Sequence, residues 1–181
     1  DSCKITNVYM KGGEPPVSFM DADMHFRRPD LIPKPSINAF IIAPNILLTK
    51  CSFEKIENKS GGIALAYYEM TCAGCSISNC DAALIFRGKL IILDETRVND
   101  CKGDTFFYGE KYIRATNNKI KGVTSSVDEN PMDIIITDGH AIVYNNDISA
   151  GLMAKASGYL VFAGTLVMQK NKINTKEMER G

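Results

Sequence analysis

The 181-residue sequence has no excess of either charge and no long hydrophobic run. Its 21 Lys and Arg residues balance its 21 Asp and Glu residues, which argues against a global electrostatic attraction to nucleic acid or to anionic lipid. No apolar segment approaches the roughly 20 residues that are needed to cross a bilayer. With 45% hydrophobic and 23% charged residues, the chain has the composition of a folded protein, and its length is typical of one domain.

The motifs of several kinds of binding site are also missing. The sequence contains no phosphate-binding glycine loop, no EF-hand calcium loop and no paired zinc motif. Cys72-Ala-Gly-Cys75 resembles half of a zinc or redox site, but no second Cys-x-x-Cys pair or histidine pair completes it. We therefore predict neither a metal site nor a cofactor. No segment combines the 3.6-residue apolar spacing of an amphipathic helix with a cap at each end.

A repeat of about two dozen residues runs through most of the chain instead. Six apolar anchor residues follow one another at intervals of 21 to 28 residues, and each lies between two polar residues. This alternation is typical of a short strand with one buried side chain. The anchors are Phe53, Ile77, Val98, Ile120, Ile148 and Ile173.

Two further positions repeat in the same register. Five residues before each anchor the chain carries an apolar or small residue, namely Leu48, Cys72, Leu93, Ala115, Val143 and Met168. Two residues before each anchor it carries Cys51, Cys75, Thr96, Asn118, Asn146 and Asn171. Asparagines that stack in equivalent positions can hydrogen bond in a ladder, although turns also favour asparagine.

The repeat predicts an all-β fold, a right-handed parallel β-helix with coils of about 21–28 residues. The segments between anchors are rich in β-branched and aromatic residues and are bounded by turn residues. We expect residues 1–37 to form an irregular amino-terminal coil or cap, residues 38–176 the β-helix and residues 177–181 a tail. Ile5 lies two repeat lengths before Phe53, so either one degenerate coil or a long excursion separates them.

One segment resembles a known family. Residues 51–65 place a Phe-containing turn before Gly61-Gly62-Ile63-Ala64, and the segment resembles the repeats of polymorphic-membrane-protein-type surface β-helices, which have a Gly-Gly-Ala-Ile-like strand start. Here the last two residues are exchanged and the motif occurs once. At the level of the pectin-lyase-like superfold the resemblance covers roughly residues 38–175. It implies a β-helix, but a superfold assigns no activity by itself.

The six cysteines favour an oxidising compartment, so we expect an extracellular or cell-surface protein. Equivalent residues in stacked coils have Cα atoms about 4.8 Å apart, which is within the range of a disulfide. We therefore predict the bridges Cys51–Cys75 and Cys80–Cys101, with Cys3–Cys72 as a third if the amino-terminal coil folds back. The alternative is that the cysteines are free thiols that pack as small apolar residues.

Asp138-Gly-His140 is the candidate catalytic fragment. Polygalacturonase-type β-helix hydrolases use aspartates and a nearby histidine, and glycoside hydrolysis needs two carboxylates around the scissile bond. The sequence lacks the Asp-Asp, Gly-His-Gly and Arg-Ile-Lys motifs of those enzymes. An Asp-Gly turn before a strand explains the same residues, so we favour no catalytic residue, and Asp138 and His140 are weak candidates.

Three functional hypotheses follow. The first is a non-catalytic surface or extracellular β-helix for adhesion or assembly, which binds a protein or glycan at its surface loops and associates with itself through open strand edges. The second is a carbohydrate-active β-helix enzyme, either a polysaccharide hydrolase or a lyase. The third is a structural subunit of a coat, tail or filament. None of them involves nucleic acid or a membrane span.

Overall fold

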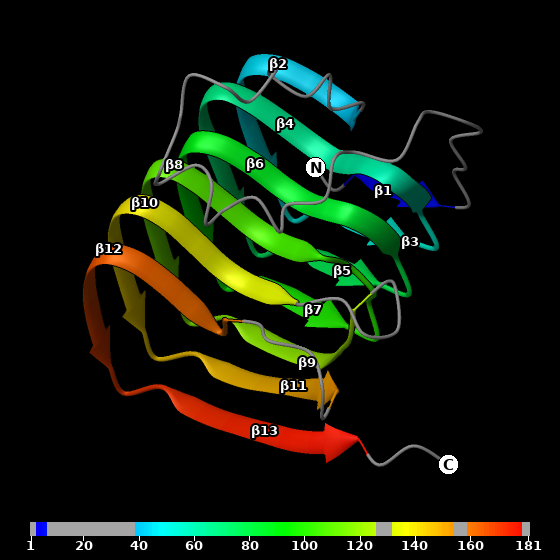
Figure 1. Cartoon of the computed structure of the whole chain (residues 1–181). Helices are drawn as coiled ribbons and strands as arrows, with labels where there is room; N and C mark the ends of the chain where they lie inside the picture. The colour runs from blue at the N-terminus through cyan, green and yellow to red at the C-terminus, as the bar shows by residue number, and fades with distance from the viewer. Residues whose placement is uncertain (1–2, 7–38, 126–131, 154–158, 179–181) are drawn as a thin grey trace, which may run out of the picture.

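The computed structural model describes residues 3–6, 39–125, 132–153 and 159–178. Within these ranges the chain forms thirteen β-strands and no helix. The strands belong to two sheets in which every pairing is parallel, and the chain passes from one sheet to the other and back in each coil (Figure 1). The result is a parallel β-solenoid of about five turns, so the predicted all-β, β-helical fold is confirmed.

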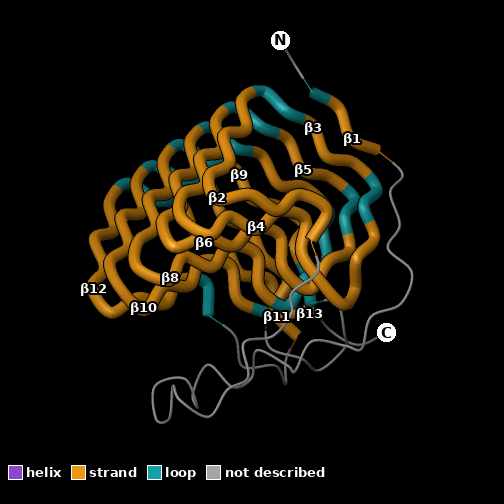
Figure 2. The backbone as a smooth tube through the Cα atoms, turned by 90° about the horizontal axis from the view of Figure 1, so that it is seen from above, coloured by secondary structure: helices purple, strands orange, loops and turns teal. Residues whose placement is uncertain are grey.

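One sheet consists mainly of short strands, and we call it the short-strand sheet. In spatial order it contains β1 (Lys4–Thr6), β3 (Ser52–Glu54), β5 (Ser76–Ser78), β7 (Arg97–Asn99), β9 (Lys119–Val123), β11 (Asp147–Met153) and β13 (Lys172–Met178). The long-strand sheet contains β2 (Ala39–Thr49), β4 (Glu57–Ala73), β6 (Asp81–Asp94), β8 (Thr105–Thr116), β10 (Asp133–Tyr144) and β12 (Val161–Gln169). In the view of Figure 2, successive coils follow similar paths and are offset from one another across the picture.

The boundaries of the predicted units can be compared with these strands. Ile5, in the predicted amino-terminal cap, pairs directly with Phe53, so β1 belongs to the stack as the neighbour of β3 in the short-strand sheet. Residues 7–38, which make up most of the predicted cap, lie outside the described part of the chain. At the other end β13 continues to Met178, into the predicted tail.

Each long strand bends part-way along its length. The pairing register shifts between Leu65 and Glu69 of β4 and between Gly88 and Leu90 of β6, and these shifts divide the strands into a first and a second leg. Gly109 of β8 lies at the equivalent point, where a Cβ atom would collide with the side chain of Ile113. Glycine permits this close approach of the backbone to the core.

The anchor residues form one stack in the short-strand sheet. Phe53 pairs with Ile77, Ile77 with Val98, and Val98 with Ile120. The stack continues through Ile148 to Ile173. All of these side chains except that of Ile173 are buried, and the core behind them includes the ring of Phe86, which meets Phe53 edge-on at 6.1 Å between ring centroids.

The turns that lead into the short-strand sheet are equally regular. In each coil one residue, directly before the column of cysteine, threonine and asparagine, adopts a left-handed conformation. These residues are Lys50, Gly74, Glu95, Asn117, Asn145 and Lys170, with φ between 50° and 62°. A single left-handed residue redirects the chain without a longer loop, which keeps the following residues in register.

The predicted asparagine ladder is present. The backbone N–H of Thr96 donates to Oδ1 of Asn118 at 2.8 Å, and the N–H of Asn118 donates to Oδ1 of Asn146 at 2.9 Å. The N–H of Asn146 donates in the same way to Asn171 at 2.9 Å. An unpaired polar group in a buried turn costs about 1–3 kcal/mol. The ladder therefore stabilises each of these turns, because it gives the backbone N–H group an acceptor.

The anchor stack leads to a prediction about stability. Shortening Ile120 to alanine should lower the free energy of unfolding by about 2–5 kcal/mol, because the cavity lies between two coils that cannot collapse onto it. The same change at Lys119, whose side chain points outward, should have an effect within about 0.5 kcal/mol. Urea denaturation of both variants measures the difference, and equal losses would contradict the register.

Candidate functional site

The cysteines are the first group of candidate residues, and the structure corrects their predicted role. None of the bridges Cys51–Cys75, Cys80–Cys101 and Cys3–Cys72 is formed, because all six cysteines are free. All of them except Cys3 are buried. In-register stacking brings the backbones of two cysteines close together, but a disulfide also needs the two sulfur atoms at bonding distance with a specific dihedral angle, which backbone stacking alone does not provide.

The buried thiols contact backbone carbonyl groups of the preceding coil. The Cys75 thiol donates to the carbonyl oxygen of Leu48 at a sulfur–oxygen distance of 3.5 Å. One coil later Thr96 Oγ1 donates to the carbonyl of Cys72 at 3.2 Å, and after it Asn118 Nδ2 donates to the carbonyl of Leu93 at 3.2 Å. Cysteine, threonine and asparagine therefore satisfy the same carbonyl position in successive coils.

A second column of cysteines has an equivalent role. The Cys80 thiol donates to the carbonyl of Phe53, and the Cys101 thiol donates to the carbonyl of Ile77, with sulfur–oxygen distances of 3.9 and 3.7 Å. A hydrogen bond with Cys80 and then burial raise the pKa of Cys101 above its usual range, which keeps that thiol protonated. The alternative role as small buried residues therefore fits the structure, with weak hydrogen bonding added.

Thiol counting tests this role. Native protein should react with Ellman's reagent at Cys3 alone, and the five buried cysteines should become reactive only in denaturant, without any reductant. Burial protects the thiols, whereas a disulfide would remove them from the count. Recovery of fewer than six thiols in denaturant, restored by a reductant, would show that bridges form in solution.

The candidate pair Asp138 and His140 lies at the bend of β10, and both residues are exposed. Oδ2 of Asp138 accepts a hydrogen bond from the hydroxyl of Tyr108 at 3.2 Å. The Arg87 guanidinium lies 5.3 Å from the centre of the Tyr108 ring and forms an ion pair with Glu110 at 3.2 Å. The bend therefore carries a polar network on three successive long strands.

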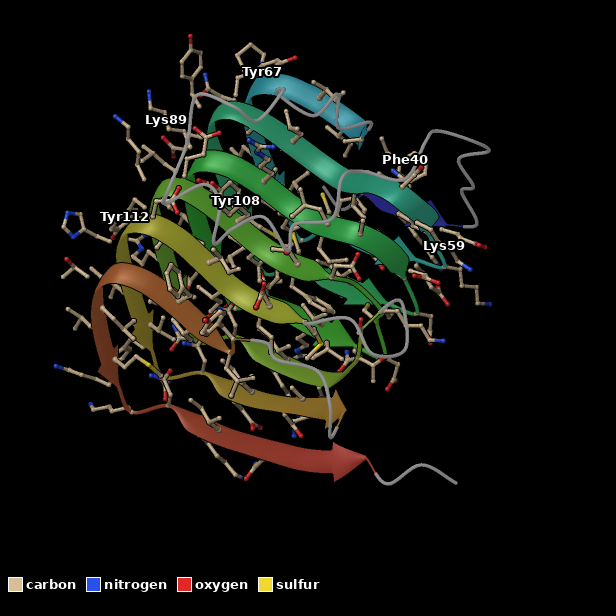
Figure 3. The ribbon with its side chains drawn as sticks, in the orientation of Figure 1. Phe40, Lys59, Tyr67, Lys89, Tyr108 and Tyr112 are labelled. Carbon is tan, nitrogen blue, oxygen red and sulfur yellow. The ribbon has the colours of Figure 1, made fainter. Side chains whose placement is uncertain are left out.

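His140 is on the other side of the register shift from this network. Its partners in the sheet are Tyr112 and Thr165, on the second legs of the long strands. Figure 3 shows Tyr67, Lys89 and Tyr112 projecting outward near the same bend from β4, β6 and β8. The structure thus joins Asp138 to Tyr108 and places His140 beside Tyr112.

The chemistry of this network differs from that of a glycosidase. Such an enzyme needs one protonated carboxylic acid and a second carboxylate on the opposite side of the scissile bond. Here Asp138 is bound by Tyr108 and Glu110 by Arg87. Burial and the negative charge of Asp138 raise the pKa of Tyr108, so the phenol remains a donor at neutral pH. These contacts hold the outer surface of the bend together.

Tyr108, Arg87 and Glu110 were not identified from the sequence. Arg87 and Tyr108 are partners in the sheet register. The signal that could have indicated them is the recurrence of polar residues at equivalent positions of successive repeats. Their pairing follows from which residues face outward at the bend, and the position of the bend becomes known only from the register shifts.

The final coil, formed by β12 and β13, is a third candidate site. Leu166 and Met168 of β12 continue two columns that are buried in every earlier coil. Ile173 of β13 continues the anchor column, which is buried from Phe53 to Ile148. Their exposed fractions are 42%, 37% and 39%. The equivalent residues one coil earlier are fully buried. Because β12 and β13 are the outermost strands of their sheets in the described part of the chain, this end presents apolar side chains beside the edge strands of both sheets.

Comparisons with protein-family models, with curated proteins and with solved structures gave no match. The β-solenoid fold therefore stands on the structure alone, and the resemblance to pectin-lyase-like or polymorphic-membrane-protein repeats gains no support from these comparisons. Among the described residues, no helix has the length and apolar character of a membrane span.

Proposed function

We propose that this chain is a non-catalytic β-solenoid module of a surface or extracellular protein, with a role in adhesion or assembly. The observation that supports assembly is the contrast between the buried core columns and their exposure in the final coil. Open edges and exposed apolar side chains of this kind recruit further strands. The partner that we propose is the first coil, β1 and β2, of a second copy of the chain.

The first coil has side chains that match the final coil column by column. Ile5 occupies the same column as Ile173, and Leu48 the same column as Met168. Among the described residues, every pairing of strands between coils is parallel and joins such columns. A head-to-tail contact would repeat this pairing between two copies, and contacts of this type build open filaments when the rotation does not close. This geometry also suits a structural subunit of a coat, tail or filament.

Two adjacent residues of β12 provide a matched test. Met168→Lys should abolish concentration-dependent self-association in sedimentation velocity, because a lysine in a core column prevents docking of another coil. Val167→Lys should leave the association intact, because Val167 lies in the outward column that includes Arg114. A wild-type chain that stays monomeric at all concentrations, or equal effects of the two substitutions, would disprove the proposal.

A third variant distinguishes head-to-tail docking from docking of two final coils on each other. Ile5→Lys alters only the first coil, so it should also block self-association in a head-to-tail contact. Mixing Ile5→Lys with Met168→Lys should then restore dimers, since each variant keeps one intact end. Self-association of Ile5→Lys alone at the wild-type level would contradict the head-to-tail arrangement. Circular dichroism shows whether each variant is folded.

The second hypothesis, a carbohydrate-active enzyme, places catalysis at Asp138 and His140. We expect no cleavage of a polyuronide by the wild-type chain, because Tyr108 binds the carboxylate of Asp138 and Arg87 binds that of Glu110. Reducing-end and unsaturated-product assays measure hydrolysis and elimination respectively. Cleavage that Asp138→Asn abolishes while the fold is intact would overturn the non-catalytic proposal.

A further inference from the structure

The outer surface of the short-strand sheet changes its character along the stack. On β3 and β5 the outward residues are three serines and one glutamate: Ser52, Glu54, Ser76 and Ser78. On the later strands four basic residues point outward, namely Arg97, Lys119, Lys121 and Lys172. We call these four the basic face. Because the chain as a whole is neutral, the basic face is a local concentration of positive charge.

The sheet register arranges the basic face regularly. Arg97 pairs with Lys119, Lys119 with Asp147, and Asp147 with Lys172. These residues form one outward column with a spacing of about 4.8 Å between strands, and Lys121 is two residues along the same strand from Lys119. Like charges on neighbouring strands are destabilising unless a counter-charge lies between them.

Asp147 is the single acidic residue among the described outward side chains of β7, β9 and β11. Its Oδ2 is 3.1 Å from Nζ of Lys121. The hydrogen bond from Lys121, together with the charges of Lys172 and Lys119, lowers the pKa of Asp147, so three lysines act on one carboxylate. One carboxylate leaves most of the positive charge of the basic face uncompensated. The acidic residues Glu95 and Asp100 lie in the turns that flank β7.

We propose that the basic face binds a sulfated polysaccharide. A linear chain with a permanently charged group on most of its sugar rings can follow a flat column of cations, and complementary charge determines the partner of such a surface. The other outward side chains here, Asn99, Ser149 and Asn174, can hydrogen bond to hydroxyl groups. No aromatic or aliphatic side chain points outward from the described residues of these strands, so nucleobases have no stacking platform and a bilayer has no apolar contact.

Titration calorimetry with dextran sulfate, and with uncharged dextran as the reference polymer, tests this proposal on the whole chain. The wild-type chain should bind dextran sulfate and not dextran. The triple variant R97Q/K119Q/K172Q should bind at least about tenfold more weakly. The negative slope of log K against log salt concentration should also decrease in magnitude by about three, because each lost cation no longer displaces a counterion from the polymer. Asp147→Asn should strengthen binding, because it removes the central negative charge.

A matched triple variant on the long-strand sheet, K89Q/K111Q/R114Q, removes the same total charge. It should retain wild-type binding, which separates a specific face from the effect of net charge. Equal losses in the two triple variants, or unchanged binding in R97Q/K119Q/K172Q, would overturn the proposal. So would tighter binding to single-stranded oligothymidine or to phosphatidylglycerol vesicles than to dextran sulfate. Since Met168 lies outside this face, Met168→Lys should bind dextran sulfate normally even if assembly through the final coil proves wrong.

Discussion

Each coil of this solenoid can bury its apolar side chains only against the coils on either side of it. In-register parallel pairing is therefore the constraint on which the rest of the structure depends. It stacks Phe53, Ile77 and Val98 into one column, and it requires turns of a fixed length, because one extra residue would reverse which side chains face the core. The left-handed residue in every turn is a consequence of this requirement. The end coils share the constraint, since a column that is buried inside the stack becomes exposed wherever stacking stops.

The same pairing explains why cysteine, threonine and asparagine can occupy one column. Every turn brings a backbone carbonyl of the preceding coil into the interior, where it needs a donor. Asn118 provides an amide, Thr96 a hydroxyl and Cys75 a thiol. The amide also has an oxygen that accepts from the neighbouring backbone N–H, so the asparagine coils gain a second hydrogen bond. The cysteine coils rely more on apolar packing, which suits a small and weakly polar side chain.

The sequence was sufficient to predict the fold but much less of the candidate sites. The repeat determines which residues stack, so the pairing of Ile120 with Ile148 and the asparagine ladder could be read from residue numbers alone. Cysteine pairing could not, since a disulfide depends on the direction of the side chain and stacking fixes only the backbone spacing. The contact between Tyr108 and Asp138 was missed because it depends on where the long strands bend. The polar residues of the basic face can be recognised in the sequence, because they flank the anchor residues. The concentration of positive charge becomes apparent only when the pairing of neighbouring strands is known.

Function in such a scaffold is expected in the columns that stacking does not constrain. The anchor positions of the short-strand sheet vary only among Phe, Ile and Val, whereas the outward column beside them changes from Ser76 to Arg97, Lys119, Asp147 and Lys172. Asp147 offsets the charge of the lysines beside it, but Arg97 pairs directly with Lys119 with no counter-charge between them in the column, and repulsion between such like charges is a cost that the fold does not require. A charge pattern that the scaffold does not need is better explained by a partner that carries the opposite charge. The exposed core columns of the final coil are different in kind, because they continue columns that the fold itself requires in the earlier coils.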